Sequence, residues 1–347
     1  MNKNPLVSII ILNFNAGKLL FNCIESLSKL TYQNVELIVV DNNSTDNSQN
    51  ECKEKFPQIK LIQNIENIGF CEGNNIGIRS AMGEFLILLN PDTRVDKNLL
   101  RELLIEYDKK GEGLYQPKLL SMDEPEKINS AGNMIHIFGF GFSRGKGVTD
   151  SKQFDENLKI NYPSGACLFT SKKIFDDIGI LDPFLWAYHD DLELGWRALK
   201  LGFNSFYVPT AIVHHKESSS FKWSKKKFFL LERNRLYCLL TQYSKKTLKK
   251  LLPYLILVEI FIFLYYIKKG LFFEKIRGYK EIIKNRKKIS EKQEELEISR
   301  KIKDVQIIAE FQDEIFVPQE VGSLRENILF NKIIGGLARH AKKSIIN

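Results

Sequence analysis

The sequence predicts an α/β fold with a mainly parallel central sheet. Short apolar runs that fit buried strands alternate, over the first 90 residues, with segments whose apolar residues recur at helical spacing. Parallel strands need crossover helices between them, so this alternation predicts a sheet of the kind found in nucleotide-binding domains. The strands expected in this part of the chain are Val7–Leu12, Val35–Val40, Lys60–Gln63 and Phe85–Leu89.

Helices are expected between these strands, and further elements are expected after them. Gly17–Leu30 has apolar residues at helical spacing, and another helix is expected to end near Met82. Residues 111–160 contain many glycines and are interpreted as loops, either a cover over a site or an irregular connection. The later elements expected are a strand at Ser164–Phe169, a helix at Lys172–Ile178, a helix from Asp190 to about Lys200 and a strand at Phe206–Val213.

The chain after residue 240 has a different character. Residues 251–267 are nearly all apolar, but a spanning helix needs about 20 residues, and a central charge such as Glu259 is costly in a bilayer. Lysines flank both ends of this run, which favours a helix attached to the surface of an anionic cytoplasmic leaflet. A spanning helix and a buried core helix stay open as alternatives. Residues 274–303 predict a charged, solvated helical stretch, and residues 324–346 predict a final amphipathic helix.

The charge of this 347-residue chain is unevenly distributed. The formal net charge is +9, yet residues 222–303 hold 23 Lys and Arg against 8 Asp and Glu. Such a basic segment indicates an anionic partner, either a phospholipid surface or nucleic acid. No zinc-finger or RRM-like motif supports nucleic acid, and the neighbouring apolar run fits a membrane better.

The cysteines and the N-terminus indicate the compartment. The five cysteines are odd in number and show no C-x-x-C spacing, which argues against a disulfide framework or a zinc site. This pattern favours a reducing compartment. The apolar run Leu6–Leu12 is too short for the core of a signal peptide, so it is interpreted as the first strand.

Polar residues follow the predicted strands at the positions where open α/β sheets bind ligands. Asp41 ends the second strand and can accept hydrogen bonds from a base or ribose, while Asp92 follows Phe85–Leu89 and suits a metal and a phosphate. A plain Asx-Pro turn is the alternative for Asp92. Gly69 and Gly73, in an Asn/Gly-rich loop, would let the backbone approach a ligand closely. Neither the dinucleotide fingerprint nor the P-loop motif is present.

An acidic cluster begins a predicted helix directly after a run of aromatic residues. Asp190, Asp191 and Glu193 would be stabilised there by the helix dipole, which explains part of the cluster. A carboxylate beside apolar surface can also have its pKa raised towards that of a general base. Further along the chain, His214 is a candidate to contact a metal or phosphate together with Asp92, although a lone histidine is more often structural.

Taken in order, these segments resemble family 2 inverting glycosyltransferases with the GT-A fold, in particular their rhamnosyltransferase-like branch. The resemblance covers about residues 5–240. The chain departs from the family pattern at Cys71, at Asn90 in place of the first Asp of D-x-D, and at Asp190 and Glu193, which replace Glu and Asp. The matching motifs are Val7–Asn15, Asp41–Asp46, Asn67–Asn75, Leu89–Asp92, Asp190–Arg197, Val213-His214 and Arg233-Asn234-Arg235.

The resemblance implies a catalytic domain at residues 1–240, and the apolar and basic composition of the rest predicts a helical, membrane-associating region at residues 241–347. The resemblance also implies that Asp191 is the general base and that Asp92 and His214 bind Mg²⁺ or Mn²⁺. The acceptor side is expected at Trp186, Tyr188, Asp190 and Glu193. The residues expected to bind the donor are Asn13, Asn15, Asp41, Asn67, Gly69, Phe70, Asn74, Asn90, Arg197 and Arg233.

The implied activity is inverting transfer of rhamnose or another hexose from a nucleoside diphosphate-sugar to a hydroxyl of a glycan acceptor. The apolar and basic C-terminal region adds the expectation of a lipid-linked acceptor and of peripheral attachment to the cytoplasmic face of the cell membrane, in cell-surface polysaccharide synthesis. One alternative is an inactive module at the membrane that binds a nucleotide-sugar or another anion. A processive polymer synthase is a second alternative, but the sequence lacks a Q-x-x-R-W run and several clear spanning helices.

Overall fold

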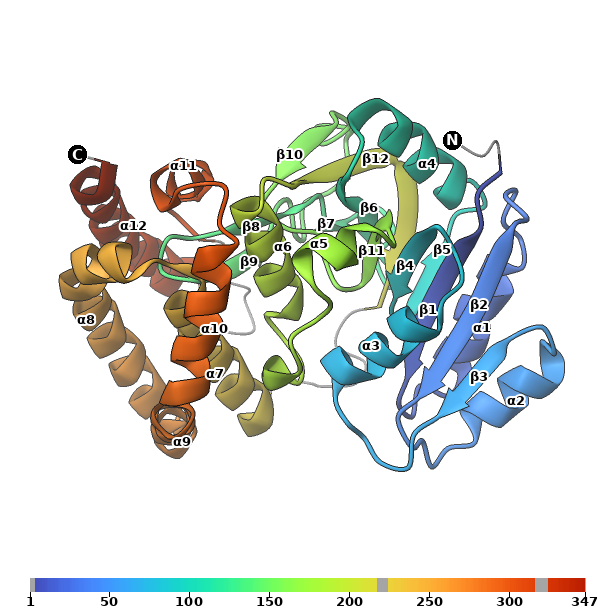
Figure 1. Ribbon diagram of the computed structural model, residues 1–347, viewed down its shortest axis with the longest axis horizontal. Helices are drawn as coiled ribbons and strands as arrows, with labels where there is room; N and C mark the ends of the chain where they lie inside the picture. The colour runs from blue at the N-terminus through green and yellow to red at the C-terminus, as the bar shows by residue number, and fades with distance from the viewer. Residues whose placement is uncertain (1–3, 217–223, 316–323, 347) are drawn as a thin grey trace. The chain divides into compact units, whose positions relative to one another are not determined.

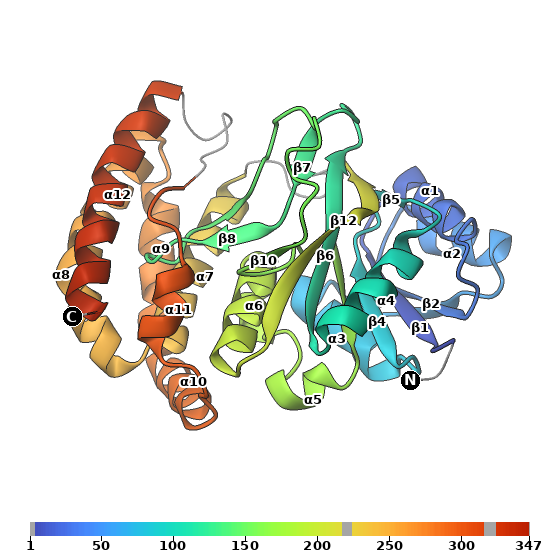
Figure 2. The ribbon, with the colours of Figure 1, turned by 90° about the horizontal axis from the view of Figure 1, so that it is seen from above.

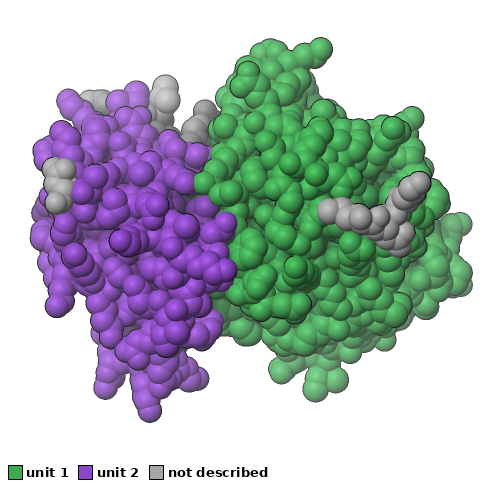
Figure 3. All heavy atoms as spheres, turned by 45° about the horizontal axis from the view of Figure 1, so that its top comes forward, with its two compact units in different colours: residues 1–133, 143–198, 203–220 green, residues 134–142, 199–202, 221–347 purple. Residues whose placement is uncertain are grey.

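The computed structural model describes residues 4–216, 224–315 and 324–346. The chain forms two compact units, which Figure 3 shows in different colours. Unit 1 comprises residues 1–133, 143–198 and 203–220, and unit 2 comprises residues 134–142, 199–202 and 221–347. The whole of α7 (Lys225–Gln242) lies in unit 2. The boundary of the catalytic domain at residue 240 stays a prediction.

One half of the main sheet in unit 1 is parallel, as the sequence predicts. Its strands are neighbours in the order β3-β2-β1-β4, and helices connect them (Figure 1). The four predicted strands are confirmed to within one residue at their ends. This half consists of β1 (Val7–Asn13), α1 (Lys18–Leu27), β2 (Val35–Asp41), α2 (Ser48–Lys55), β3 (Lys60–Gln63), α3 (Phe70–Ser80) and β4 (Phe85–Leu89).

The other half of the sheet is mixed, because β11 runs antiparallel between β4 and β6. β6 and β12 lie side by side and pair in parallel (Figure 2). The elements here are β5 (Thr93–Val95), α4 (Leu99–Lys110), β6 (Gly113–Ser121), β7 (Ile128–Ser130), β10 (Leu158–Ile160), β11 (Cys167–Ser171), α5 (Ile174–Ile178), the 3₁₀ turn η1 (Pro183–Leu185), α6 (Asp190–Lys200) and β12 (Asn204–His215). A separate two-stranded sheet is formed by β8 (Asn133–Ile135) and β9 (Gly141–Ser143).

The prediction that residues 111–160 form loops is wrong for the strands within that range, above all for β6. Its sequence is interrupted by Gln116-Pro117-Lys118, so it lacks the continuous apolar run of a buried strand. Lys118 is nevertheless buried, because its ammonium group forms ion pairs with Asp150 and Asp155. These partners are distant in sequence, so only the tertiary structure makes this strand possible.

Both faces of the sheet are covered at β1, whose residues alternate between them. Ile9 and Ile11 belong to a core cluster with residues of α1 and α4. Ile10 faces α3 so closely that a Cβ at Gly77 would lie 2.3 Å from its Cγ2 atom. Leu12 meets Gly73 in the same way. With both faces packed, the carboxyl ends of the strands are the positions left for a ligand site.

Unit 2 is built mainly from helices. The apolar run predicted at residues 251–267 lies within the longer helix α8 (Lys245–Lys268). By length and composition, α8 could cross a membrane. The charged stretch after it forms two helices, and the final predicted helix is confirmed. The helices after α7 are α8 (Lys245–Lys268), α9 (Phe272–Lys284), α10 (Arg286–Ile298), α11 (Asp304–Glu310) and α12 (Leu324–Ile346).

Candidate active site

The ends of β1 and β2 form a polar cluster in unit 1. Asn13 lies opposite Asp41 in the sheet, and its Nδ2 donates a hydrogen bond to Asp41 Oδ1 over 2.8 Å. The Ser44 backbone N–H and hydroxyl also donate to Asp41. Asn15, with φ +52°, accepts from the Thr45 N–H at 2.7 Å. The side chains predicted to bind the donor therefore also hold the loop after β2 in place.

The loop before α3 is organised by its own asparagines. Asn67 Oδ1 accepts from the Gly69 N–H at 3.0 Å, and Asn42 Nδ2 donates to the Gly69 carbonyl at 2.9 Å. Asn74 is buried and donates to the Phe70 carbonyl at 2.9 Å. The predicted donor-binding residues of this loop thus come together, and they fix its backbone.

Trp186 connects this loop to the acidic helix. Its carbonyl accepts from the backbone N–H groups of Phe70 and Cys71 at the start of α3, at 2.6 and 3.1 Å. Gly69, with φ +91°, gives room for the Trp186 ring, since a Cβ there would lie 2.6 Å from the ring. Trp186, Tyr188 and His189 all have φ between +61° and +67°. Such backbone strain in non-glycine residues is typical of functional sites, so this segment is held in one shape by its surroundings.

Asp92 lies after β4, but the histidine beside it is His215. His215 Nε2 is 3.4 Å from Asp92 Oδ1, and its Nδ1 contacts the Asn129 side chain at 3.0 Å. Successive side chains of a strand point to opposite faces, so His214 cannot share this position. Burial and the charge of Arg94 lower the pKa of His214. The structure therefore places His215, rather than His214, beside Asp92, and the predicted role of His214 as a metal ligand stays a prediction.

Asp92 and His215 offer a carboxylate oxygen and an imidazole nitrogen, a donor set that suits Mn²⁺. Among the residues that the structure describes, no cluster of three or more His, Cys, Asp or Glu is arranged to hold a metal. The protein would therefore supply two ligands, and phosphate oxygens and water would supply the rest, as is common for Mg²⁺ and Mn²⁺ sites with phosphate ligands.

Asp190, which is buried, and Asp191, which is half-buried, are neighbours at the start of α6. Asp191 accepts from the Gly165 N–H at 3.1 Å and from the Leu192 N–H at 2.8 Å. Burial raises the pKa of both carboxyls, and the charge of Asp191 raises the pKa of Asp190 further. Backbone hydrogen bonds oppose the rise in pKa at both residues, but the charges of Asp191 and Glu193 add to the rise at Asp190. Asp190 therefore holds a proton more readily, and Asp191 is the better candidate for an ionised base.

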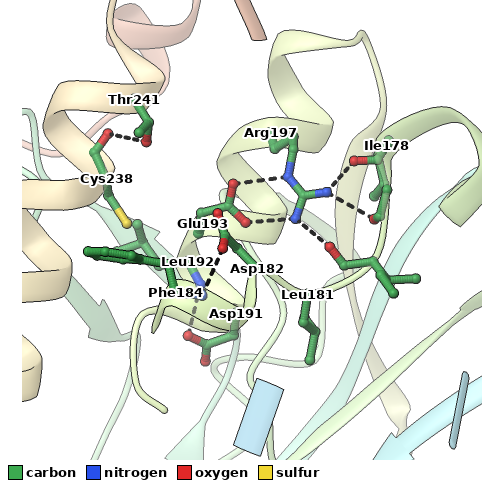
Figure 4. Close-up of polar contacts among 12 residues, drawn as sticks. Ile178, Leu181, Asp182, Phe184, Asp191, Leu192, Glu193, Arg197, Cys238 and Thr241 are labelled. Carbon is green, nitrogen blue, oxygen red and sulfur yellow. Dashed lines mark hydrogen bonds and ion pairs between the residues drawn. The ribbon is translucent and has the colours of Figure 1, made fainter. Parts of the chain in front are cut away.

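Glu193 and Arg197 are held in the interior of unit 1 (Figure 4). Two nitrogens of the Arg197 guanidinium donate to the two oxygens of Glu193 at 2.9 and 2.7 Å. The remaining donors meet the carbonyls of residues 178–180. All five guanidinium N–H groups are thus engaged within the protein. The pair anchors α6 to the segment after α5. The roles of Arg197 in donor binding and of Glu193 on the acceptor side stay predictions.

Two other predicted residues have backbone or local roles in the structure. The Asn90 N–H donates to the Ala166 carbonyl at 3.0 Å, which ties the turn after β4 to the segment before β11. Arg233 lies on α7 in unit 2, where it donates to the Asn234 side chain at 2.9 and 2.7 Å. The donor-binding roles of Asn90 and Arg233 stay predictions.

Sequence reasoning missed Gly165, His215 and Asn75. The side-chain amide of Asn75 donates to the Leu181 carbonyl at 2.8 Å and accepts from the Leu181 N–H at 3.0 Å. The Gly165 N–H donates to Asp191, whereas the sequence predicts only a strand at Ser164–Phe169. Strand alternation within β12 predicts that the side chains of His214 and His215 point to opposite faces, but it does not predict which of them faces Asp92.

The family of this chain follows from comparison with known proteins. Residues 8–179 match the model of the family described as Glycosyl transferase family 2. These residues form a glycosyl transferase family 2 domain. The strand ends, the Asn/Gly-rich loop and Asp92 all lie within this match.

Several relatives carry glycosyltransferase names. The chain is 26% identical over 206 residues to the low-salt glycan biosynthesis hexosyltransferase Agl10 of Haloferax volcanii, covering 57% of this chain and 63% of that protein. It is 26% identical over 245 residues to the N-acetylglucosaminyl-diphospho-decaprenol L-rhamnosyltransferase of Mycobacterium tuberculosis, covering 62% and 78%. The chain thus spans just under two thirds of the archaeal relative's length.

A solved structure of GalNAc-T7 with UDP, GalNAc and Mn²⁺ has a similar fold. The TM-score is 0.57 at 17% sequence identity, over 71% of this chain and 49% of that one. At this identity the likeness shows the fold alone. It supports an α/β fold with a mixed, GT-A-like central sheet, followed here by a helical C-terminal region.

Proposed function

We propose that the glycosyltransferase moves rhamnose or another hexose, with inversion, from a nucleoside diphosphate-sugar to a hydroxyl of a lipid-linked glycan acceptor. One arrangement carries this proposal: the carboxylate of Asp191 and the turn leading to Asp92 are both fixed by the short segment before β11. Asp191 accepts from the N–H of Gly165, while the Asn90 N–H donates to the carbonyl of Ala166. A candidate base and a candidate metal ligand are therefore held at the same edge of the sheet.

The proposed step is a single displacement. The acceptor hydroxyl oxygen forms a bond to the anomeric carbon while the bond from that carbon to the diphosphate oxygen breaks, and the diphosphate leaves with the electron pair. Asp191 takes the hydroxyl proton from a position within about 2.6–3.2 Å of the acceptor oxygen. A divalent cation, held by Asp92 and His215, would neutralise charge on the leaving diphosphate. Attack from the face opposite the leaving group inverts the anomeric centre, as in inverting glycosidases.

The partners are supported by the relatives and by the charge of the chain. The name of the mycobacterial relative describes rhamnosyl transfer to a diphospholipid-linked sugar, which supports rhamnose and a lipid-linked acceptor here. The basic segment at residues 222–303 supports peripheral attachment to an anionic membrane, with the cytoplasmic face as the proposed side. Cell-surface polysaccharide synthesis is the process proposed for this reaction.

The first test measures release of nucleoside diphosphate from dTDP-rhamnose, UDP-GlcNAc, UDP-galactose and GDP-mannose, with Mn²⁺ or with EDTA, on membranes and on purified protein. Release from one donor that depends on the metal is expected. If no donor binds and none is cleaved, the transferase proposal fails, and an inactive module that binds an anion is the better explanation.

The second test substitutes the proposed base. Asp191→Asn should lower the transfer rate by about a hundredfold or more, because general base catalysis typically contributes a factor of this size. Donor affinity, measured by calorimetry, should stay near that of the wild type. The control is Asp123→Asn, at an exposed position. Weak donor binding with substantial residual transfer would contradict the role of Asp191.

A further inference from the structure

Helix α8 of unit 2 has one buried face and one exposed apolar face. At about 100° per residue, the two sets of side chains lie on opposite sides of the helix. The buried side chains are Thr247, Leu251, Val258, Ile262 and Tyr266. The exposed apolar side chains, each between 39% and 56% accessible, are Leu252, Ile256, Leu257, Ile260, Phe261, Leu264 and Ile267.

Aromatic side chains extend this apolar surface beyond the end of α8. The Phe263 ring contacts the Phe272 ring at 5.7 Å between centroids, and Phe272 contacts Phe273 at 5.5 Å. Phe273 is 79% exposed. A contiguous exposed patch of this kind is unusual on a protein surface that stays in water and indicates an interaction site.

Positive charges lie at both ends of the exposed face. Lys245, Lys246 and Lys249 are exposed in the first turns of α8, and Lys268 and Lys269 are exposed at its end. Lys245 pairs with Glu294 of α10 at 2.9 Å. An apolar centre between lysines matches the chemistry of an anionic phospholipid surface, which offers acyl chains and negative head groups together.

Glu259, the acidic residue of α8, points away from that face into a cluster of charges. It forms ion pairs with Arg235 of α7 and, at 2.7 Å, with Lys275 of α9, and it accepts from the Tyr279 hydroxyl at 2.6 Å. Burial alone would raise the pKa of Glu259, but the charges of Arg235 and Lys275 outweigh it and hold that pKa well below its usual range. Glu232 pairs with both cations as well.

This cluster bears on the orientation of α8 at a membrane. If α8 crossed the bilayer, the charged groups of α7 and α9 that pair with Glu259 would have to enter the hydrocarbon with it or leave Glu259 unpaired there. Either outcome is expensive for the protein. A helix lying in the plane of the surface avoids this cost, because its apolar face enters the interface while its charged side stays within unit 2.

We propose that the exposed face of α8, with Phe272 and Phe273, docks onto an anionic phospholipid bilayer with the helix axis parallel to the membrane plane, and that α8 does not cross it. This inference deepens the peripheral attachment included in the proposed function, and it does not depend on catalysis.

The first experiment measures flotation of the full chain with vesicles of phosphatidylcholine alone or with 30% phosphatidylglycerol. Binding is expected only with the anionic lipid and should weaken as salt rises. The double variant Ile260→Glu/Leu264→Glu should reduce partitioning by about tenfold or more, because two aliphatic side chains lose their burial. The matched control is Ile298→Glu, at an 88% exposed position at the end of α10. If the double variant binds vesicles as well as the wild type does, or if the wild type binds neutral and anionic vesicles equally, the proposed docking face is wrong.

The second experiment measures how deeply three positions of α8 lie in the bilayer. A fluorophore is attached to Leu252→Cys, Ile260→Cys or Ile267→Cys in turn, since all five native cysteines are buried. Quenchers at known depths in the bilayer then locate each label. Leu252 and Ile267 are separated by about 22 Å along the helix. Equal, shallow depths are expected for all three labels. A graded profile, with Ile260 at the bilayer centre, would show a spanning helix instead.

The Asp191→Asn variant separates this inference from the proposed function. It should bind anionic vesicles as the wild type does, because Asp191 lies in unit 1 and far in sequence from α8. If donors are cleaved but vesicles are not bound, the docking proposal alone fails. If vesicles are bound but no donor is cleaved or bound, the transferase proposal alone fails.

Discussion

The carboxyls of Asp190 and Asp191 are neighbours with different surroundings. Asp191 receives N–H groups from Gly165 and Leu192. Burial and then the charge of Asp191 raise the pKa of Asp190, and backbone hydrogen bonds at Asp190 and Tyr188 offset only part of this rise. Two interacting carboxyls titrate as a pair, and a proton shared unequally between them is one way to keep one ionised as a base.

The substitution Asp190→Asn tests this assignment through stability. A carboxyl whose pKa is raised by folding loses stability as pH rises from its unfolded pKa, near 4, to its folded pKa, because only the unfolded state ionises in that window. Asp190→Asn removes this loss, so its melting temperature should exceed that of the wild type at pH 7 and converge with it towards pH 4. Each unit of pKa shift corresponds to about 1.4 kcal/mol. The exposed control Asp123→Asn should show no such trend. A difference in melting temperature between Asp190→Asn and the wild type that does not depend on pH would contradict the assignment.

His215 and His214 provide a matched pair for the metal proposal. His215→Ala should weaken binding of Mn²⁺, measured by electron paramagnetic resonance in the presence of UDP or dTDP, by about tenfold or more, a loss seen even when only a second-shell partner is removed. His214→Ala should leave this affinity unchanged, because its side chain lies beside Arg94 rather than Asp92. Equal losses in the two variants would overturn the assignment to His215.

At the scale of elements, the segment between η1 and α6 depends on α3. The Trp186 carbonyl accepts from two N–H groups at the start of α3, and the Trp186 ring packs where only glycine fits at residue 69. The N–H groups of a helix start otherwise have no partner within the helix. The segment that carries the strained Tyr188 and His189 therefore has a fixed support, and Asp190 and Asp191 follow it directly.

Gly69→Ala should disturb this support. The new Cβ would lie 2.6 Å from the Trp186 ring, so the ring must move, and transfer should fall together with stability. Gly111→Ala is the matched control, since Gly111 also has positive φ but nothing within 4 Å of the added Cβ. Both variants carry the backbone cost of about 1 kcal/mol for alanine at positive φ. Urea unfolding should show a larger loss for Gly69→Ala, and equal losses would mean that the ring contact is unimportant.

At the scale of the whole molecule, each unit holds its own buried charge cluster. Arg197 and Glu193 belong to unit 1, while Glu259 and its partners belong to unit 2. Removing one member of a buried ion pair leaves the other charge uncompensated, which typically costs about 3–5 kcal/mol. Substitutions in one cluster should therefore change the stability of its own unit and leave that of the other unit unchanged.

Hydrogen–deuterium exchange can measure the local stability of each unit separately. Arg197→Met should increase exchange in unit 1, around α6 and residues 178–180, and Glu259→Gln should increase exchange in α7, α8 and α9 of unit 2. Arg79→Met is the control, because its ion pair with Glu72 is largely exposed and should contribute little. Uniform destabilisation of the whole chain by either variant would contradict separate cores.

The sequence by itself determined the elements that depend on local pattern. The strands β1 to β4 follow from short apolar runs, the start of α6 from its acidic cluster, and the C-terminal helices from apolar and charged segments. Neighbouring residues alone fix all of these patterns. The polar residues Asn13, Asp41 and Asp92 were placed correctly at strand ends, since a buried apolar run must stop where the chain turns. These features need no knowledge of distant partners.

Only the tertiary structure decided the rest, because the use of a polar side chain depends on residues far away in the chain. Lys118 is buried in β6 because Asp150 and Asp155 meet it. Arg197, predicted to bind a donor, has all its N–H groups engaged by Glu193 and backbone carbonyls. His215 faces Asp92 because the pairing of β12 in the sheet fixes which side chains point to that face.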